Sequence, residues 1–122
     1  MGNFIIRNVP SGVKFDLLAT NGQAILTSEV YNTWAACRKG VDSVIRNASE
    51  ANLEDQTLAE TRRVPCPKFE LYHDRAGAYR FRLKATNGQI IGVSESYKAK
   101  ASCENGIHSV MKNVLDAEVI GV

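Results

Sequence analysis

The chain of 122 residues lacks the features that several classes of protein require. No apolar run approaches the roughly 20 residues of a membrane-spanning helix, and the start, MGNFIIRN, has no apolar stretch of the length found in a secretory signal. None of the three cysteines, Cys37, Cys66 and Cys103, belongs to a CxxC pair, which argues against a disulfide framework. We therefore expect a soluble, cytoplasmic protein with no membrane partner.

An excess of one charge is also missing. The net charge is +2, which is too small to imply a polyanionic partner by itself. Residues 1–61 contain 5 basic and 7 acidic residues, whereas residues 62–122 contain 10 basic and 6 acidic ones. An argument for nucleic-acid binding must therefore depend on the second half.

Three scattered cysteines and two histidines do not supply the four ligands of a typical zinc site, and we expect no cofactor.

The five-residue phrase ATNGQ occurs twice, at residues 19–23 and 85–89. Around it, residues 15–48 align without a gap with residues 81–114, and 17 of these 34 positions are identical. The chain therefore contains an internal duplication. A unit of about 50 residues buries little surface alone, so we expect the two copies to close around a pseudo-twofold axis. The expected monomeric, pseudo-dimeric domain has repeat 1 at about 2–57, a linker at about 58–67 and repeat 2 at about 68–122.

Strand and turn patterns precede a helical pattern in each copy. Residues 79–84 alternate, with Tyr79, Phe81 and Leu83 on one face and basic residues on the other, which is typical of a half-buried strand. The Asn-Gly pair inside ATNGQ lies between two strand-like segments and predicts a type I′ hairpin turn.

Apolar residues then recur at helical spacing in each copy, and a short strand-like piece follows at residues 51–55 and 116–122. Gly40 and Gly106 fall on the apolar side of these helices, which predicts close approach to the sheet or to the other helix. Each unit thus has the order β-β-β-α-β. We expect an α+β fold in which two helices cover one face of an antiparallel sheet.

The second copy resembles the YegP-like family of small bacterial and archaeal proteins, which contain a domain of unknown function. The resemblance is carried by KFELY at residues 68–72, FRLKATNGQIIGVSESY at 81–97 and KASCENGIHSV at 100–110. It covers nearly the whole chain, since the first copy shares the pattern more loosely. It implies β-β-β-α-β units, in tandem or as a homodimer, that join into one sheet and exchange their last strands. It brings no established activity, cofactor or catalytic residue.

A polar trio recurs at the expected strand-to-helix junction of both copies, and its members are Ser28, Glu29 and Tyr31, and Ser94, Glu95 and Tyr97. The trios could form a paired ligand site. They could equally satisfy backbone donors at the helix starts, where hydroxyls and carboxylates are favoured.

A basic stripe formed by Arg80, Arg82 and Lys84 follows one face of a predicted strand in the second copy. Such a stripe can contact phosphates, or it can be a solvated face. The corresponding stripe of the first copy, Lys14, Asp16 and Leu18, is not basic. Any ligand of the open face should therefore bind the two halves unequally.

A cysteine nucleophile is not favoured. Cys103 and His108 are five residues apart, which is about 140° of rotation on a helix, so their side chains diverge. Cys37 and Cys103 both fall on the predicted apolar face, where cysteine acts as a small core residue.

The leading hypothesis is a non-enzymatic binding or interaction module, for which a protein partner is one option, because the duplicated scaffold shows no catalytic constellation. The alternative is weak nucleic-acid binding through the basic sheet face of repeat 2. A third hypothesis, an enzyme, would use Ser94, Glu95 and Tyr97 with their counterparts.

Overall fold

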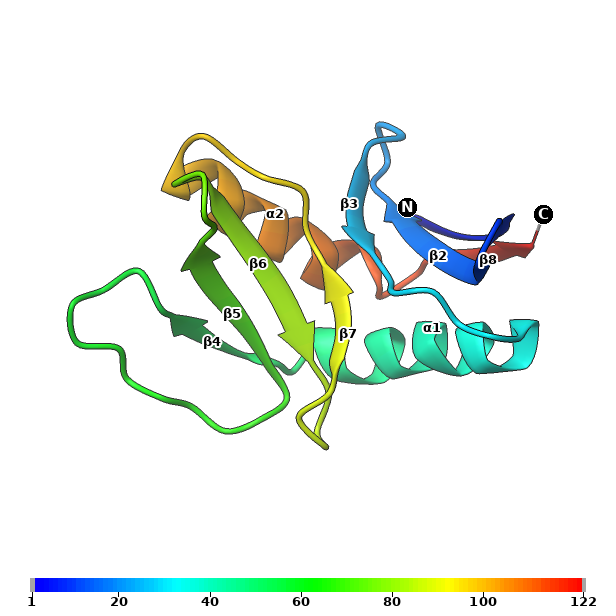
Figure 1. Ribbon diagram of the computed structural model, residues 1–122, viewed down its shortest axis with the longest axis horizontal. Coiled ribbons are helices and arrows are strands. Elements are labelled where there is room, and N and C mark those ends of the chain that lie inside the picture. The colour runs from blue at the N-terminus through cyan, green and yellow to red at the C-terminus, as the bar shows by residue number, and fades with distance from the viewer. Residues whose placement is uncertain (1, 122) are drawn as a thin grey trace.

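The computed structural model describes residues 2–121, which form eight strands and two helices (Figure 1). In chain order these are β1 (Asn3–Val9), β2 (Gly12–Leu18), β3 (Ala24–Thr27), α1 (Trp34–Ala48), β4 (Asn52–Asp55), β5 (Lys68–His73), β6 (Tyr79–Lys84), β7 (Ile90–Val93), α2 (Lys100–Asn113) and β8 (Glu118–Gly121). The predicted order β-β-β-α-β is thus present twice. The last predicted strand piece includes Val122, which lies outside the described residues. Neither helix within residues 2–121 has the length and apolarity to cross a membrane.

All eight strands form one sheet in the order β4-β5-β6-β7-β3-β2-β1-β8. This order is symmetric about the contact between β7 and β3. Strand β4, which ends the first half, pairs with β5 of the second half, and β8, which ends the second half, pairs with β1 of the first (Figure 1). The exchange of last strands that the family resemblance implies is therefore present, and the predicted α+β class is confirmed.

The sheet is mixed, and the prediction of an antiparallel sheet is wrong at its two edges. The pairs β1–β8 and β4–β5 are parallel, whereas the five other neighbouring pairs among the described strands are antiparallel. Short hairpins enforce antiparallel pairing within each half. The last strand of each half instead follows a helix that carries the chain across to the other half, so no hairpin fixes its direction.

One face of the sheet packs against both helices and the other face is open. Phe81 and Leu83 are fully buried on the helix side, as the alternation of β6 predicts, while the basic residues between them face the open side. The two halves use the same core contact: Phe69 packs edge-to-face on Phe81, and Phe4 packs in the same way on Phe15, both with ring centroids 5.8 Å apart. The core therefore follows the duplication.

Glycines in the helices allow tyrosine side chains to pack closely. A Cβ atom on Gly106 would lie 2.5 Å from Oη of Tyr97 and 3.0 Å from the ring of Phe81. Gly40 has the same relation to Tyr31 in the first half. The predicted close approach is confirmed, and it explains why both helices retain a residue that costs about 1 kcal/mol relative to alanine.

The ATNGQ turns are hairpins with three-residue loops. The N–H of Ala19 donates to the carbonyl of Gln23 at 2.9 Å, and the N–H of Gly22 donates to the carbonyl of Ala19 at 2.8 Å. No non-glycine residue among residues 2–121 has a positive φ, so the predicted type I′ turn is wrong. A three-residue loop needs positive φ only at its last position, which Gly22 supplies with a φ of 84°. Asn21 Oδ1 accepts the N–H of Gln23 at 3.0 Å and fixes the loop.

The threonine of the repeated phrase connects the two halves. Thr86 Oγ1 donates to Oδ1 of the buried Asn47 at 3.0 Å, which ties a turn of the second half to helix α1 of the first. Asn47 in turn donates to the carbonyl of Ser43 at 2.7 Å. Asn113 makes the equivalent bond to the carbonyl of Ser109 in α2, at 2.8 Å. The bond from Thr86 therefore joins the two halves, while the bonds to Ser43 and Ser109 orient the asparagine side chains on their own helices.

Candidate functional site

The serines of the two polar trios bind the backbone of a neighbouring strand. Ser94 Oγ accepts the N–H of Phe81 at 2.9 Å and donates to the carbonyl of Glu95 at 2.8 Å, and the side chain is buried. Ser28 makes the same two contacts in the first half, at 2.9 and 2.7 Å. The alternative that the trios satisfy donors at the helix starts is wrong, because the helices begin only at residues 34 and 100. Thr33 caps α1 instead.

The other trio members point in different directions. Tyr31 and Tyr97 pack under the helices, and burial, followed by the nearby carboxylates, raises the pKa of both phenols. Glu29 and Glu95 are exposed. Glu95 accepts a hydrogen bond from Nε2 of Gln23 of the other half at 3.2 Å. The serine, carboxylate and phenol of a trio therefore do not converge on one point.

The cysteines of the two helices are core residues, as predicted. Cys37 and Cys103 are fully buried, and burial raises the pKa of both thiols, that of Cys103 to about 11. The thiolate fraction at neutral pH is therefore small. His108 is exposed. Within residues 2–121 no three His, Cys, Asp or Glu side chains lie together in a way that could hold a metal ion.

The basic stripe on β6 is paired with carboxylates. Arg80 Nε lies 2.9 Å from Asp74 Oδ2, Arg82 Nε lies 2.6 Å from Glu70 Oε1, and Lys84 Nζ lies 3.2 Å from Glu70 Oε2. The three candidate residues do lie on one open face, but they are not simply solvated cations. Their positions are fixed by neighbouring acids.

Two of these cations belong to a larger group, which we call the ion cluster, formed by Glu54 of β4, Lys68 and Glu70 of β5, and Arg82 and Lys84 of β6. Lys68 Nζ lies between the carboxylates, 2.8 Å from Glu54 and 3.3 Å from Glu70. Glu54 and Glu70 are only 3% and 2% exposed. The cluster thus places two acids under three cations on the open face of the sheet.

Both carboxylates of the ion cluster are ionised at neutral pH. The hydrogen bond from Lys68, with a second from Gln56, lowers the pKa of Glu54 to about 2. Burial by itself would raise the pKa of Glu70, but hydrogen bonds from Arg82, Lys84 and Lys68 outweigh it, and the pKa is lowered.

A groove of about 440 Å³, which we call the charged groove, lies over the ion cluster. The long loop between β4 and β5, which projects from the edge of the sheet in Figure 1, forms one wall. Val64 of this loop donates its N–H to Glu54 Oε1 at 3.0 Å. The loop also supplies Arg63, which is exposed and makes no ion pair within residues 2–121. On the sheet, the guanidinium carbon of Arg82 lies 4.4 Å from the ring centroid of Tyr72.

The other half of the sheet has no ion cluster at the equivalent positions. Ile5 pairs with Ile120 there, as Glu70 pairs with Glu54 here. Leu18 takes the place of Lys84 in the same register. Sequence reasoning missed Glu54 and Glu70, because the gapless alignment did not extend to β4 or β5. A comparison of Ile5 in β1 with Glu70 in β5 would have shown that a charged residue occupies this position in only one of the two copies.

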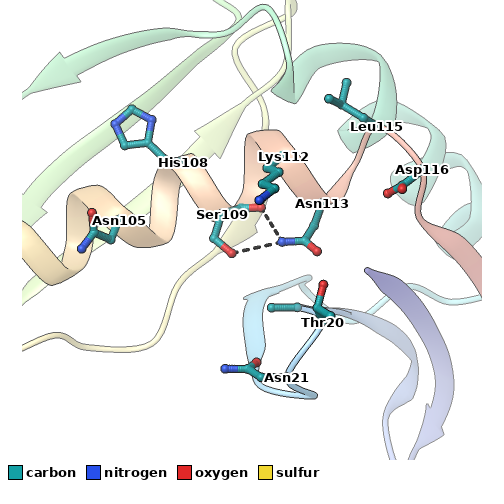
Figure 2. A pocket seen from close by; sticks show the side chains of 10 residues that line it. Thr20, Asn21, Asn105, His108, Ser109, Lys112, Asn113, Leu115 and Asp116 are labelled. Carbon is teal, nitrogen blue, oxygen red and sulfur yellow. Dashed lines mark hydrogen bonds between the residues drawn. The ribbon is translucent and has the colours of Figure 1, made fainter. Parts of the chain in front are cut away.

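A second groove, of about 710 Å³, lies between the β2–β3 turn and the last turns of α2 (Figure 2). Its lining includes Thr20, Asn21, Asn105, His108, Ser109, Lys112, Asn113, Leu115 and Asp116. Its three ionisable groups are exposed and form no ion pair among the described residues. Within residues 2–121 no ion pair holds these charges in place, in contrast to those of the charged groove.

A family model described as a domain of unknown function (DUF1508) matches residues 12–55 and 74–120, which together are more than half of the chain. The chain belongs to the DUF1508 family. Its two matched segments correspond to the two copies of the duplication. The DUF1508 description carries no biochemical role, and the candidate site therefore depends on the geometry described above.

Relatives of this DUF1508 chain occur with two copies and with one. The UPF0339 protein YegP of Yersinia pestis is 36% identical over 120 residues, covering 98% of this chain and 94% of that protein. A UPF0339 protein of Treponema denticola is 54% identical over 55 residues, covering 45% of this chain and 95% of that protein. The solution structure of yegP from E. coli, a protein of unknown function, has a TM-score of 0.78 at 32% identity and covers 98% of this chain and 91% of that one.

Proposed function

We propose that this protein is a non-enzymatic binding module that takes anionic ligands on the open face of β4, β5 and β6. The observation that carries the proposal is the ion cluster, whose two carboxylates are buried and hydrogen-bonded and which is confined to one half of a duplicated sheet. Burying charges costs solvation free energy, and apolar residues of similar size often stabilise a protein equally well. The other half forms the same sheet with Ile5, Leu18 and Ile120 at three of the equivalent positions, so the fold does not require the cluster.

The side-chain contacts support binding rather than catalysis. Ser28 and Ser94 use their hydroxyl protons on backbone carbonyls, and the thiols of Cys37 and Cys103 are buried and protonated. Among residues 2–121, none of these hydroxyls and thiols is hydrogen-bonded to a side-chain base that could activate it as a nucleophile. The open face instead offers fixed cations, which suits recognition of an anion.

Weak nucleic-acid binding through the same face is the second candidate. It is favoured by the surplus of cations, since the charged groove contains four basic and two acidic side chains. Binding of this kind should weaken steeply as salt rises. Charge reversal at Arg80 and Arg82 should weaken it further.

The proposal can be tested by amide NMR of the labelled protein, titrated with inorganic phosphate and with a short single-stranded RNA at low salt. We expect resonances of β5 and β6 to shift with at least one of these anions. The variant Lys84→Leu, which introduces the residue that the other half has, should reduce the response. Lys14→Ala on the opposite half is the control and should leave it unchanged. If neither anion shifts β5 or β6, the proposal is wrong.

A further inference from the structure

The cations of the charged groove have hydrogen-bond donors to spare. All four carboxylate oxygens of the ion cluster accept hydrogen bonds or contact a lysine within the protein. In contrast, Nη1 and Nη2 of Arg82 donate to no group among residues 2–121, and Arg63 has no hydrogen-bonded partner there. Lys84 Nζ contacts only Glu70 within the same residues. The acids are therefore satisfied, while the cations retain donors for a ligand.

The donors of these cations face the solvent, because the cations are partly exposed and the acids beneath them are buried. Glu54 and Glu70 are almost completely buried, whereas the side chains of Arg82 and Lys84 are 28% and 26% exposed. Arg63 is exposed on the loop that forms the wall. A ligand that enters the groove thus meets basic groups, with the acids underneath. The acids hold the cations in position, which reduces the ordering cost of binding.

The charge and size of the groove match one class of ligand. Four basic side chains over two ionised acids leave a surplus of two positive charges. A phosphate monoester carries a charge of about −1.5 to −2 at neutral pH and has three strong acceptor oxygens. Guanidinium groups pair with phosphate oxygens in a bidentate geometry. A volume of about 440 Å³ is within the range of small-molecule sites.

We infer that the charged groove binds a dianionic phosphate group, held by Arg82 and Lys84 on the sheet and by Arg63 on the loop. This inference rests on the proposed function, and it narrows the ligand from any anion to a small terminal phosphate. Free inorganic phosphate and the phosphate of a small ester share this chemistry. A nucleic-acid chain presents mainly phosphodiesters with one charge each, which fit the surplus of two charges less well.

The test measures phosphate affinity in two matched variants of the full chain. Inorganic phosphate and phenyl phosphate are each titrated by calorimetry, and the arginine Nε–Hε resonances are followed by NMR. Arg63→Ala should weaken phosphate binding by about tenfold or more, because it removes a charge-assisted contact. Arg62→Ala, the neighbouring residue outside the groove lining, should change it less than twofold. Both side chains are exposed, so the urea midpoint should stay the same in both variants.

The outcomes separate this inference from the broader proposal. Binding of inorganic phosphate that depends on Arg63 and not on Arg62 supports the inference, and stronger binding of phenyl phosphate would identify an ester as the better ligand. Shifts on β5 and β6 with an RNA that lacks a terminal phosphate, but none with inorganic phosphate or phenyl phosphate, would overturn the inference and leave the proposed function standing. Equal weakening in both variants would overturn it as well, since it would indicate diffuse attraction to the loop. No response to any anion would overturn both.

Discussion

Replacing Glu70 with alanine should destabilise the protein strongly, whereas replacing most of the ion cluster should not. Glu70 lies within 3.3 Å of nitrogen atoms of Lys68, Arg82 and Lys84, so its removal leaves cations facing one another. Removing one partner of a buried ion pair typically costs about 3–5 kcal/mol. We expect about 3 kcal/mol, at the lower end, because Arg82 and Lys84 are about a quarter exposed and Lys68 keeps Glu54.

The comparison is a fourfold variant that places residues of the other half at four of the five equivalent positions and keeps Arg82. It carries Glu54→Ile, Lys68→Asn, Glu70→Ile and Lys84→Leu, following the pairing of β8, β1 and β2. This variant removes more charged groups than the single one, but it leaves only Arg82 without its carboxylate, whereas Glu70→Ala leaves both Arg82 and Lys84 without one. We expect its free energy of unfolding to lie within about 1 kcal/mol of the parent, as for other apolar replacements of buried ion pairs.

Both variants can be measured by urea denaturation followed by far-UV circular dichroism and by fluorescence of the single tryptophan. A slope of about 1–3 kcal/mol per molar urea converts a loss of 3 kcal/mol into a fall in midpoint of about 1–3 M. A fourfold variant less stable than Glu70→Ala would refute the reasoning. It would mean that the fold itself requires the ion cluster, and the main support for a binding role would be lost.

Three further outcomes follow from other contacts. Gly106→Ala should destabilise by about 1–3 kcal/mol in thermal melts, because the added methyl group would lie 2.5 Å from Oη of Tyr97 and strain outweighs the better helix propensity; a rise in Tm would contradict the close packing. Thr86→Val should cost about 1 kcal/mol through the lost bond to Asn47, measured by urea midpoint, with no cost if the turn is free. The pKa of Glu54 is about 2 in the folded protein, against an ordinary value of 4.5. The ionised Glu54 therefore adds about 3 kcal/mol to the free energy of unfolding above pH 4.5, and this contribution is lost as the pH falls towards 2. Glu54→Gln should flatten the pH dependence of stability, measured by urea denaturation between pH 2 and pH 6.

Local patterns predicted those parts of the fold that depend on one segment. The alternation in residues 79–84 identified the buried face of β6, and the helical spacing placed Cys103 in the core. Gly106 on the apolar side predicted close approach to the sheet or to the other helix, and its neighbours are Tyr97 and Phe81 of β6 on the sheet side. Each of these signals lies within a few residues along the chain, where backbone geometry fixes which side chains share a face. The exchange of last strands came from the family resemblance rather than from local spacing.

The ion cluster could not be predicted in the same way, because its members come together only through the exchange of strands. Glu54 lies in the last strand of the first half, and Lys68 lies in the first strand of the second half. Their contact depends on the parallel pairing of β4 with β5. Charge counting found the basic excess of the second half, but not the acid that pairs with it. The prediction of a type I′ turn was wrong because the Asn-Gly pair alone does not specify the number of residues in the loop.

The duplication makes the two halves of the sheet controls for each other. The halves agree where the fold requires particular residues. Tyr31 stacks on Phe15 and Tyr97 stacks on Phe81, with ring centroids 6.4 Å apart in both pairs. Where they differ at equivalent positions of the same sheet, the fold accepts either residue. The open face differs in this way, with Ile5, Leu18 and Ile120 beside the Arg7–Asp16 ion pair over β8, β1 and β2, and with the ion cluster over β4, β5 and β6. Since the half without the ion cluster forms the same sheet, the ion cluster and its groove are the part of the molecule that binding explains better than stability does.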